Sequence, residues 1–258
     1  MFTALLDTCV LWSSSQRDFL LSLAAEGLYR PVWSSAILAE LQYEESAKLV
    51  RRGTSVDDAS GRAAHLVAEM RRAFDDAEVV GYQGLEGTYG LPDPDDEHVV
   101  AAAVVAGAGA IVTVNGHDFP AESLPDGLDV LTPSQFAHNT VALAPTLGLH
   151  ALRSMAARSG RLGPPTTVEE ILVRLEDRFG MGDSVRLIRE ALSKTAGQAG
   201  HRVGMPRSRL RWPDPAIGAP SGDARGARLG GSAPRSPGRS YLSRFLAMTT
   251  RWIWFVPS

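Results

Sequence analysis

Short apolar runs and longer amphipathic stretches alternate along the chain, which predicts the order strand, helix, strand, helix. The apolar runs predict five buried strands, at Phe2–Leu6, Tyr29–Trp33, Glu78–Tyr82, Ala110–Val114 and Leu128–Leu131. Apolar positions three and four residues apart predict helices between them. This alternation predicts an α/β fold with a parallel sheet that helices cover on both faces.

The helices have recognisable start signals. They are expected at Arg17–Leu28, Ser35–Arg52, Ser55–Asp76, from Pro94 onward and from Pro133 onward. From about Ala144 the pattern becomes purely helical. We therefore divide the chain into an α/β domain at 1–137, a helical extension at 138–197 and a tail at 198–258.

The tail differs sharply from the rest in composition. It is rich in Arg, Pro, Gly and Ser and has almost no apolar periodicity, which predicts disorder. Of 26 basic and 29 acidic residues, ten arginines but only Asp214 and Asp223 lie in 201–258, which leaves 16 basic against 27 acidic side chains before it. Nucleic-acid-binding domains are usually basic. A nucleic-acid site in the first 200 residues must therefore rest on local groups, a metal or a second subunit.

Cysteine content and hydropathy indicate a soluble, cytoplasmic protein. The lone Cys9 cannot form an internal disulfide, which fits a reducing compartment. The first residues lack the basic region of a signal peptide. The apolar segment Tyr241–Pro257 is interrupted by Arg244 and Arg251, so no membrane span is expected.

Carboxylates mark the candidate chemistry. Asp7 closes the first predicted strand, and a cluster precedes the apolar helix after Leu91: Asp93, Asp95, Asp96 and Glu97. Helix capping accounts for Asp93, and for Asp7 it is an equal alternative to a role at a site. Asp96 instead heads the helix face that must pack on the sheet, where a carboxylate needs a partner.

Four acids from separate elements form the candidate site: Asp7, Glu40, Asp96 and Asp118. In a parallel sheet, three of them reach the same carboxyl edge. Carboxylate oxygens in such numbers suit Mg²⁺ or Mn²⁺. A divalent ion there could activate a water molecule against a phosphodiester. His98 and His117 flank these acids, and we interpret both as structural.

Four motifs, taken in order, resemble those of the PIN-domain ribonucleases, including VapC-type toxins. They are Leu5–Leu11, Ser35–Leu41, Asp93–Ala103, and Ile111–Asn115 with Asp118–Pro120. The resemblance covers residues 1–137. The helices to about Leu192 resemble the C-terminal extension of a larger bacterial subgroup, and the tail resembles nothing in the family.

The resemblance implies a three-layer α/β/α sandwich and metal-dependent endonucleolytic cleavage of structured RNA such as tRNA or rRNA. It also implies the toxin of a type II toxin–antitoxin system. Such a toxin forms a homodimer and is inhibited by a small antitoxin that occupies the acidic cleft.

By position, the resemblance implies that Asp7, Asp96 and Asp118 bind the metal and that Glu40 helps to bind metal or to activate water. Supporting roles fall to neighbouring polar residues, Thr8, Asp95, Thr113 and Asn115. Two assignments stay open. Asp95 competes with Asp96 for the third acid, and Asn115 competes with Asp118 for the fourth.

Two other functions fit parts of the sequence. A degenerate PIN fold would bind RNA or a protein without cutting. A phosphatase with an aspartate nucleophile also places an Asp after its first strand, but it expects an acid where Cys9 stands and a downstream lysine. The chain has only Lys48 and Lys194.

Overall fold

A computed structural model of the protein describes residues 1–160 and 164–201. Five parallel strands form one sheet in the order β3-β2-β1-β4-β5. They are β1 (Thr3–Leu6), β2 (Arg30–Ser34), β3 (Glu78–Val79), β4 (Ala110–Val112) and β5 (Asp129–Leu131). The predicted α/β fold is therefore confirmed. Residues 198–201 of the predicted tail end the last helix, and 202–258 lie outside the described residues.

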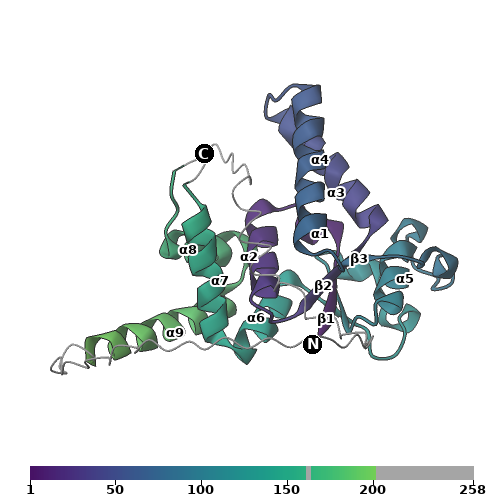
Figure 1. Cartoon of the computed structure of the whole chain (residues 1–258). Helices are drawn as coiled ribbons and strands as arrows, with labels where there is room; N and C mark the ends of the chain where they lie inside the picture. The colour runs from purple at the N-terminus through teal and green to yellow at the C-terminus, as the bar shows by residue number, and fades with distance from the viewer. Residues whose placement is uncertain (161–163, 202–258) are drawn as a thin grey trace, which may run out of the picture.

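Helices cover both faces of this sheet, as in a three-layer sandwich (Figure 1). The α-helices are α1 (Thr8–Leu11), α2 (Ser14–Ala25), α3 (Ser35–Arg51), α4 (Val56–Ala73), α5 (Glu97–Val105), α6 (Pro133–Leu143), α7 (Pro145–Arg158), α8 (Val168–Phe179) and α9 (Gly182–His201). Short 3₁₀ turns are η1 (Gln83–Leu85), η2 (Pro94–Asp96), η3 (Gly116–Asp118) and η4 (Ala121–Ser123). In Figure 1, α2 and α6 lie on one side of the strands and α5 on the other. Within the described ranges, no helix is long and apolar enough to cross a membrane.

Polar caps begin the helices that follow three of the strands. Asp7 caps α1 directly after β1, Ser34 caps α3 after β2, and Thr132 caps α6 after β5. Each side chain accepts a backbone N–H that the first helical turn leaves unpaired. Since parallel strands end at one edge, these caps collect at the carboxyl edge of the sheet.

Several elements differ from their predicted bounds: β4 stops at Val112 rather than Val114, and α2 spans Ser14–Ala25 rather than Arg17–Leu28. The edge strand β3 stops at Val79 rather than Tyr82, because Gly81 adopts a φ of 79° and turns the chain. The helix predicted from Pro94 begins as the 3₁₀ turn η2, and the α-helical part starts only at Glu97. The acidic cluster is thus split between a tight turn and the first turn of α5.

The helical extension packs directly on the N-terminal domain. Buried side chains of α7, α8 and α9 belong to the same hydrophobic core as the sheet. Arg158 of α7 donates from Nη2 to Asp18 Oδ1 (2.8 Å) and to Ser22 Oγ (2.8 Å) on α2, and the Arg158 and Asp18 side chains are buried.

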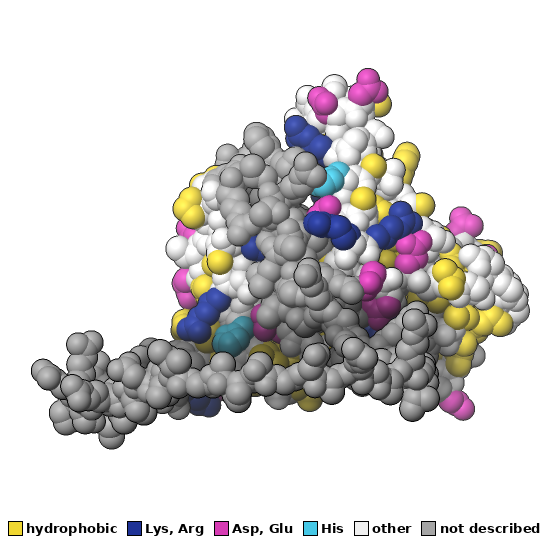
Figure 2. Space-filling model, in the orientation of Figure 1, with side chains coloured by type: hydrophobic (Ala, Val, Ile, Leu, Met, Phe, Trp, Pro, Cys, Tyr) yellow, Lys and Arg dark blue, Asp and Glu magenta, His cyan; other side chains and the backbone are white. Residues whose placement is uncertain are grey.

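Surface charges are mixed in sign around α3 and α4. Figure 2 shows basic and acidic side chains next to one another there. Arg71 of α4 forms a two-pronged pair with Glu78, with Nε 2.6 Å from Oε2 and Nη2 3.0 Å from Oε1, and Arg72 pairs with Glu69. Such exposed pairs contribute little to stability. They do neutralise much of the positive charge on this face.

Candidate active site

Asp7 directly follows β1 and precedes α1, and it lies beside the residues that follow β4. Its Oδ1 accepts the N–H of Thr8 (2.6 Å), and its Oδ2 accepts the hydroxyl of Thr113 (2.7 Å) and the thiol of Cys9 (3.1 Å). Thr113 follows β4 and is buried. The carboxylate is only 8% exposed, so these donors fix its orientation.

Capping does not use all of the Asp7 carboxylate. An ionised carboxylate has about four acceptor positions, and three donors are in place here. One acceptor position therefore remains for a cation. The two explanations considered for Asp7, an N-cap and a site residue, are compatible.

Glu40 of α3 lies near the carboxyl edge of the sheet and contacts residues of α1 and α5. Its Oε2 accepts the hydroxyl of Thr8 (2.7 Å), and its Oε1 lies 3.1 Å from His98 Nε2 on α5. The other ring nitrogen of His98 lies 3.1 Å from Ser34 Oγ, the cap of α3. Glu40 is thus positioned by α1 and α5, and its side chain is 50% exposed.

The Glu40–His98 contact has the electrostatics of an ion pair. Burial is the largest single effect and opposes charge on both side chains, but the hydrogen bonds and charges around each of them together outweigh it. The pKa of Glu40 is therefore lowered and the pKa of His98 is raised. The charges of Asp7 and Asp96 raise the pKa of His98 further. We interpreted His98 as structural. The structure shows that it also belongs to the acidic site, a role that its place in the acid-rich motif only hinted at.

Asp96 ends the 3₁₀ turn η2 and is partly buried among other carboxylates. Partial burial, followed by the charges of Asp7, Asp118 and Asp93, raises its pKa to about 6. His98 offsets this only in part. Negative charges from three elements therefore repel one another at this edge, which is what a bound cation would relieve.

The neighbouring carboxylates differ from Asp96: Asp93 is a capping residue, and Asp95 points to solvent. Asp93 caps η2, with its Oδ1 accepting the N–H of Asp95 (2.9 Å). Asp95 is exposed, whereas Asp96 is half-buried beside the other acids. The geometry thus favours Asp96 over Asp95 as the third acid.

Glu97 anchors the loop before the acidic turn. Its buried carboxylate accepts the N–H groups of Tyr89 (3.1 Å) and Leu91 (3.2 Å). Burial raises the pKa of Glu97, but these backbone donors outweigh it and the pKa is lowered. Glu97 is therefore a structural acid, a role that its place in the cluster did not reveal.

Asp118 lies in η3 after β4, and its charge acts on Asp96. Its Oδ1 lies 3.1 Å from His117 Nε2. Asn115 is exposed, and its backbone N–H donates to Thr113 Oγ1 (3.0 Å). Of the two candidates for the fourth acid, Asp118 is the one coupled to the acidic group.

The donor set fits a hydrated cation better than a closed cage. Within residues 1–160 and 164–201, no three His, Cys, Asp or Glu side chains converge tightly enough to enclose a metal. Mg²⁺ usually keeps several waters and takes only one or two carboxylates. Asp7 and Asp96, which repel each other across the edge, provide that smaller set.

The requirements of an aspartate-nucleophile phosphatase are not met. Burial, then the charge of Asp7, raises the pKa of Cys9 to about 12, so a neutral thiol stands where an acid is expected. Lys48 contacts the Trp12 carbonyl (3.3 Å) and Glu45. Lys194 is exposed on α9.

Comparison with known proteins agrees with the site's location. Residues 3–117, somewhat less than half of the chain, match a family model described as PIN domain. The match includes Asp7, Glu40 and Asp96 and stops one residue before Asp118. No curated protein and no solved structure matches the chain.

Proposed function

We propose that the PIN domain matched by residues 3–117 is a divalent-metal-dependent endoribonuclease that hydrolyses phosphodiester bonds in structured RNA. The family match supports nuclease activity in general. Metal dependence and an RNA substrate are our extension of it.

One observation carries the proposal. Asp7, Asp96 and Asp118 come from three separate elements, and their charges are close enough that two of them raise the pKa of the third. Crowded carboxylates are costly unless a cation or a proton compensates them. Perturbed acids of this kind cluster at functional sites.

Asp7 and Asp96 would hold the metal, with Asp118 completing the acidic set. A bound Mg²⁺ or Mn²⁺ would supply a water of lowered pKa and offset charge on the phosphoryl group. Thr8 and Thr113 hold Asp7 in one orientation, so its free acceptor position is fixed before RNA arrives. Glu40 contacts His98 at the rim of the site, 3.1 Å from its Nε2, and raises the pKa of His98.

The test is cleavage of RNA by the purified full chain with Mg²⁺ or Mn²⁺, and with EDTA. Asp7→Asn and Asp96→Asn are expected to abolish cleavage. Asp95→Asn is the matched control, because it removes an equal charge one residue away from an exposed position. Cleavage that survives in Asp7→Asn and Asp96→Asn, or that is lost equally in Asp95→Asn, would reject the assignment.

We further propose that the protein is a cytoplasmic type II toxin that forms a homodimer. A small antitoxin would hold it inactive at the acidic edge, the carboxyl edge of the sheet that carries Asp7, Glu40, Asp96 and Asp118. The acids there would attract a basic segment of the antitoxin. Growth arrest on expression, relieved by the protein encoded by the adjacent reading frame, is the expected result. Arrest that persists with Asp7→Asn would separate toxicity from cleavage and reject this role.

A second candidate is an RNA- or protein-binding module without catalysis. It is favoured by the absence, in the described part of the chain, of three converging metal ligands. It is also favoured by Glu40, whose two oxygens both face partners. Calorimetric titration with Mn²⁺ separates the two functions: a nuclease should bind Mn²⁺ in an Asp7-dependent manner, and an inert module should not.

A further inference from the structure

A cavity of about 150 Å³ lies where the N-terminal domain meets the helical extension. Four elements form it: the end of α1, the start of α2, the end of α3 and the end of α8. Its basic lining residues are Lys48, Arg52, Arg174 and Arg178, and we call it the basic pocket. Trp12 and Phe179 add aromatic rings to its wall.

The arginines of the basic pocket lack acidic partners in the described part of the chain. Within residues 1–160 and 164–201, no ion pair joins Arg52, Arg174 or Arg178 to a carboxylate. Arg174 acts on Glu170 only through its charge. Lys48 is bonded to Glu45 and stacks over Trp12, with Nζ 5.6 Å from the ring centroid. Three guanidinium groups are thus without an acidic partner among the described residues, in a chain whose first 200 residues are acidic on balance.

A helix start adds to this positive charge. Ser13 caps α2 without a side-chain hydrogen bond, and Ser14 and Ser15 of the first turn line the cavity. The N–H groups of a first turn have no partners within the helix and favour anions. Basic residues near the ends of α3 and α8 could merely complement each helix dipole. That explanation does not account for their meeting at the positive end of a third helix.

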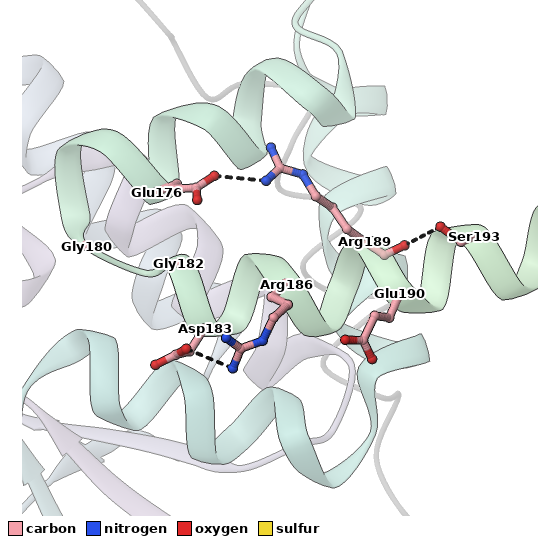
Figure 3. A pocket seen from close by; sticks show the side chains of 8 residues that line it. All are labelled: Glu176, Gly180, Gly182, Asp183, Arg186, Arg189, Glu190 and Ser193. Atoms are coloured by element: carbon pink, nitrogen blue, oxygen red, sulfur yellow. Dashed lines mark hydrogen bonds and ion pairs between the residues drawn. The ribbon is translucent and has the colours of Figure 1, made fainter.

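A second groove serves as a comparison, because its arginines are paired with acids of the same groove. It lies between α8 and α9, with a volume of about 690 Å³. Figure 3 shows Arg189 reaching from α9 to Glu176 of α8, and Arg186 turned to Asp183. Its arginines are already paired with acids, so it has little charge left for a ligand.

The basic pocket lies close to the candidate active site. Thr8 begins α1 and bonds to Glu40, while Trp12 follows α1 and bonds through its carbonyl to Lys48. At 1.5 Å per residue, Thr8 and Trp12 are about 6 Å apart along the helix axis, and Glu40 and Lys48 about 12 Å. An extended nucleic-acid strand covers that distance in a few nucleotides.

We infer that the basic pocket binds a backbone phosphate of the RNA a few nucleotides from the bond placed at Asp7 and Asp96. This inference rests on the proposed function for its substrate. Arginine suits the role, because its planar donors match phosphate oxygens. Because Arg174 and Arg178 come from α8, the helical extension becomes part of the substrate site.

The test measures RNA binding separately from cleavage. The full chain carrying Asp7→Asn is titrated in EDTA with a fluorescent RNA hairpin whose single-stranded loop has about 12 nucleotides, a length within the usual range of single-strand sites. Adding Arg174→Ala and Arg178→Ala is expected to weaken binding roughly tenfold, as loss of charge-assisted hydrogen bonds does. The slope of log affinity against log salt should fall by about 0.7 for each phosphate that the protein no longer neutralises.

The control is Arg186→Ala in the paired groove, which removes a similar charge from the extension and is expected to leave affinity unchanged. The tail's ten arginines contribute equally to every variant. Unchanged affinity in the double variant, or an equal loss in Arg186→Ala, would overturn the inference. Arg174→Lys with Arg178→Lys guards against misfolding and should restore part of the affinity. If the chain with its natural Asp7 does not cut RNA in Mg²⁺ or Mn²⁺, the proposed nuclease activity fails, while the binding result still tests the basic pocket.

Discussion

The acidic edge and the basic pocket lie at opposite ends of α1, and they are built differently. At the acidic edge, short side chains are held by hydrogen bonds from several elements, as Asp7 is by Thr8 and Thr113. At the basic pocket, long arginine side chains approach from α3 and α8 and form no ion pair with an acid among the described residues. One region is preorganised and the other is adaptable.

This difference predicts a division of labour. Fixed groups stabilise a transition state because they need no reorganisation during the reaction. Long, adaptable cations attract a phosphate backbone but position it loosely. Substitutions at the acidic edge should therefore lower kcat, and substitutions at the basic pocket should raise KM.

The largest effect is expected for Asp7→Asn, with a fall in kcat of about 10³-fold or more, because the proposed metal site would lose one of its charges. RNA affinity should stay the same or rise, since one negative charge is removed. Folding should survive, because Asn is as good an N-cap as Asp. Single-turnover rates and binding isotherms check this, and a loss of affinity equal to the loss of rate would break the comparison.

A smaller effect is expected for Thr113→Val, which removes the hydroxyl that orients Asp7. Groups that orient metal ligands are worth about 10- to 100-fold in activity or metal affinity. We expect a fall of that size in kcat with KM unchanged, measured under steady state. Thr88→Val is the control for loss of a hydroxyl, since Thr88 Oγ1 donates to the carbonyl of Leu85 (2.6 Å) and not to Asp7. Wild-type kcat in Thr113→Val would show that Asp7 needs no such support.

For Arg52→Ala in the basic pocket, we expect KM for RNA to rise about threefold with kcat unchanged. A change of that size corresponds to the loss of part of one charge-assisted hydrogen bond. Arg62→Ala on α4 serves as an exposed control. A fall in kcat with unchanged KM would place Arg52 with the acidic edge instead.

The smallest effect concerns stability. In metal-free buffer, Asp96→Asn should raise Tm by about 2–4 °C at pH 7, the shift that roughly 1 kcal/mol produces in a domain of this size. The pKa of Asp96 is raised from 3.8 to about 6, so its charge destabilises the folded state fully above pH 6 and not at all well below pH 4. The gain should therefore vanish as the pH falls through that window. Scanning calorimetry measures it, and a lower Tm in Asp96→Asn at pH 7 would contradict the repulsion.

The sequence predicted the acidic edge because topology alone determines it. Parallel strands end on one side, so an Asp after β1 and acids near β4 had to approach each other. The function of single carboxylates was harder to predict. Glu97 differs from Asp96 only by one position, yet that step of about 100° around a helix takes it from the acidic group to the loop at Tyr89 and Leu91.

The basic pocket could not have been predicted from the chain. Its cations are spread from Lys48 to Arg178, and each one is an ordinary basic residue of a helix. Only the packing of α8 beside α2 and α3 brings them together. The same holds for the His98–Glu40 contact, which requires α3 and α5 to approach across the carboxyl edge.

The buried hydrogen bonds from Arg158 to Asp18 and Ser22 affect where the chain could be cut into parts that fold separately. A fragment trimmed to residues 1–137 would retain the sheet and every acid of the edge, but it would uncover a carboxylate and an apolar helix surface on α2 that normally never meet water. The part of the chain that resembles a known family therefore does not coincide with the part that is expected to fold by itself, and a separated N-terminal portion is expected to aggregate.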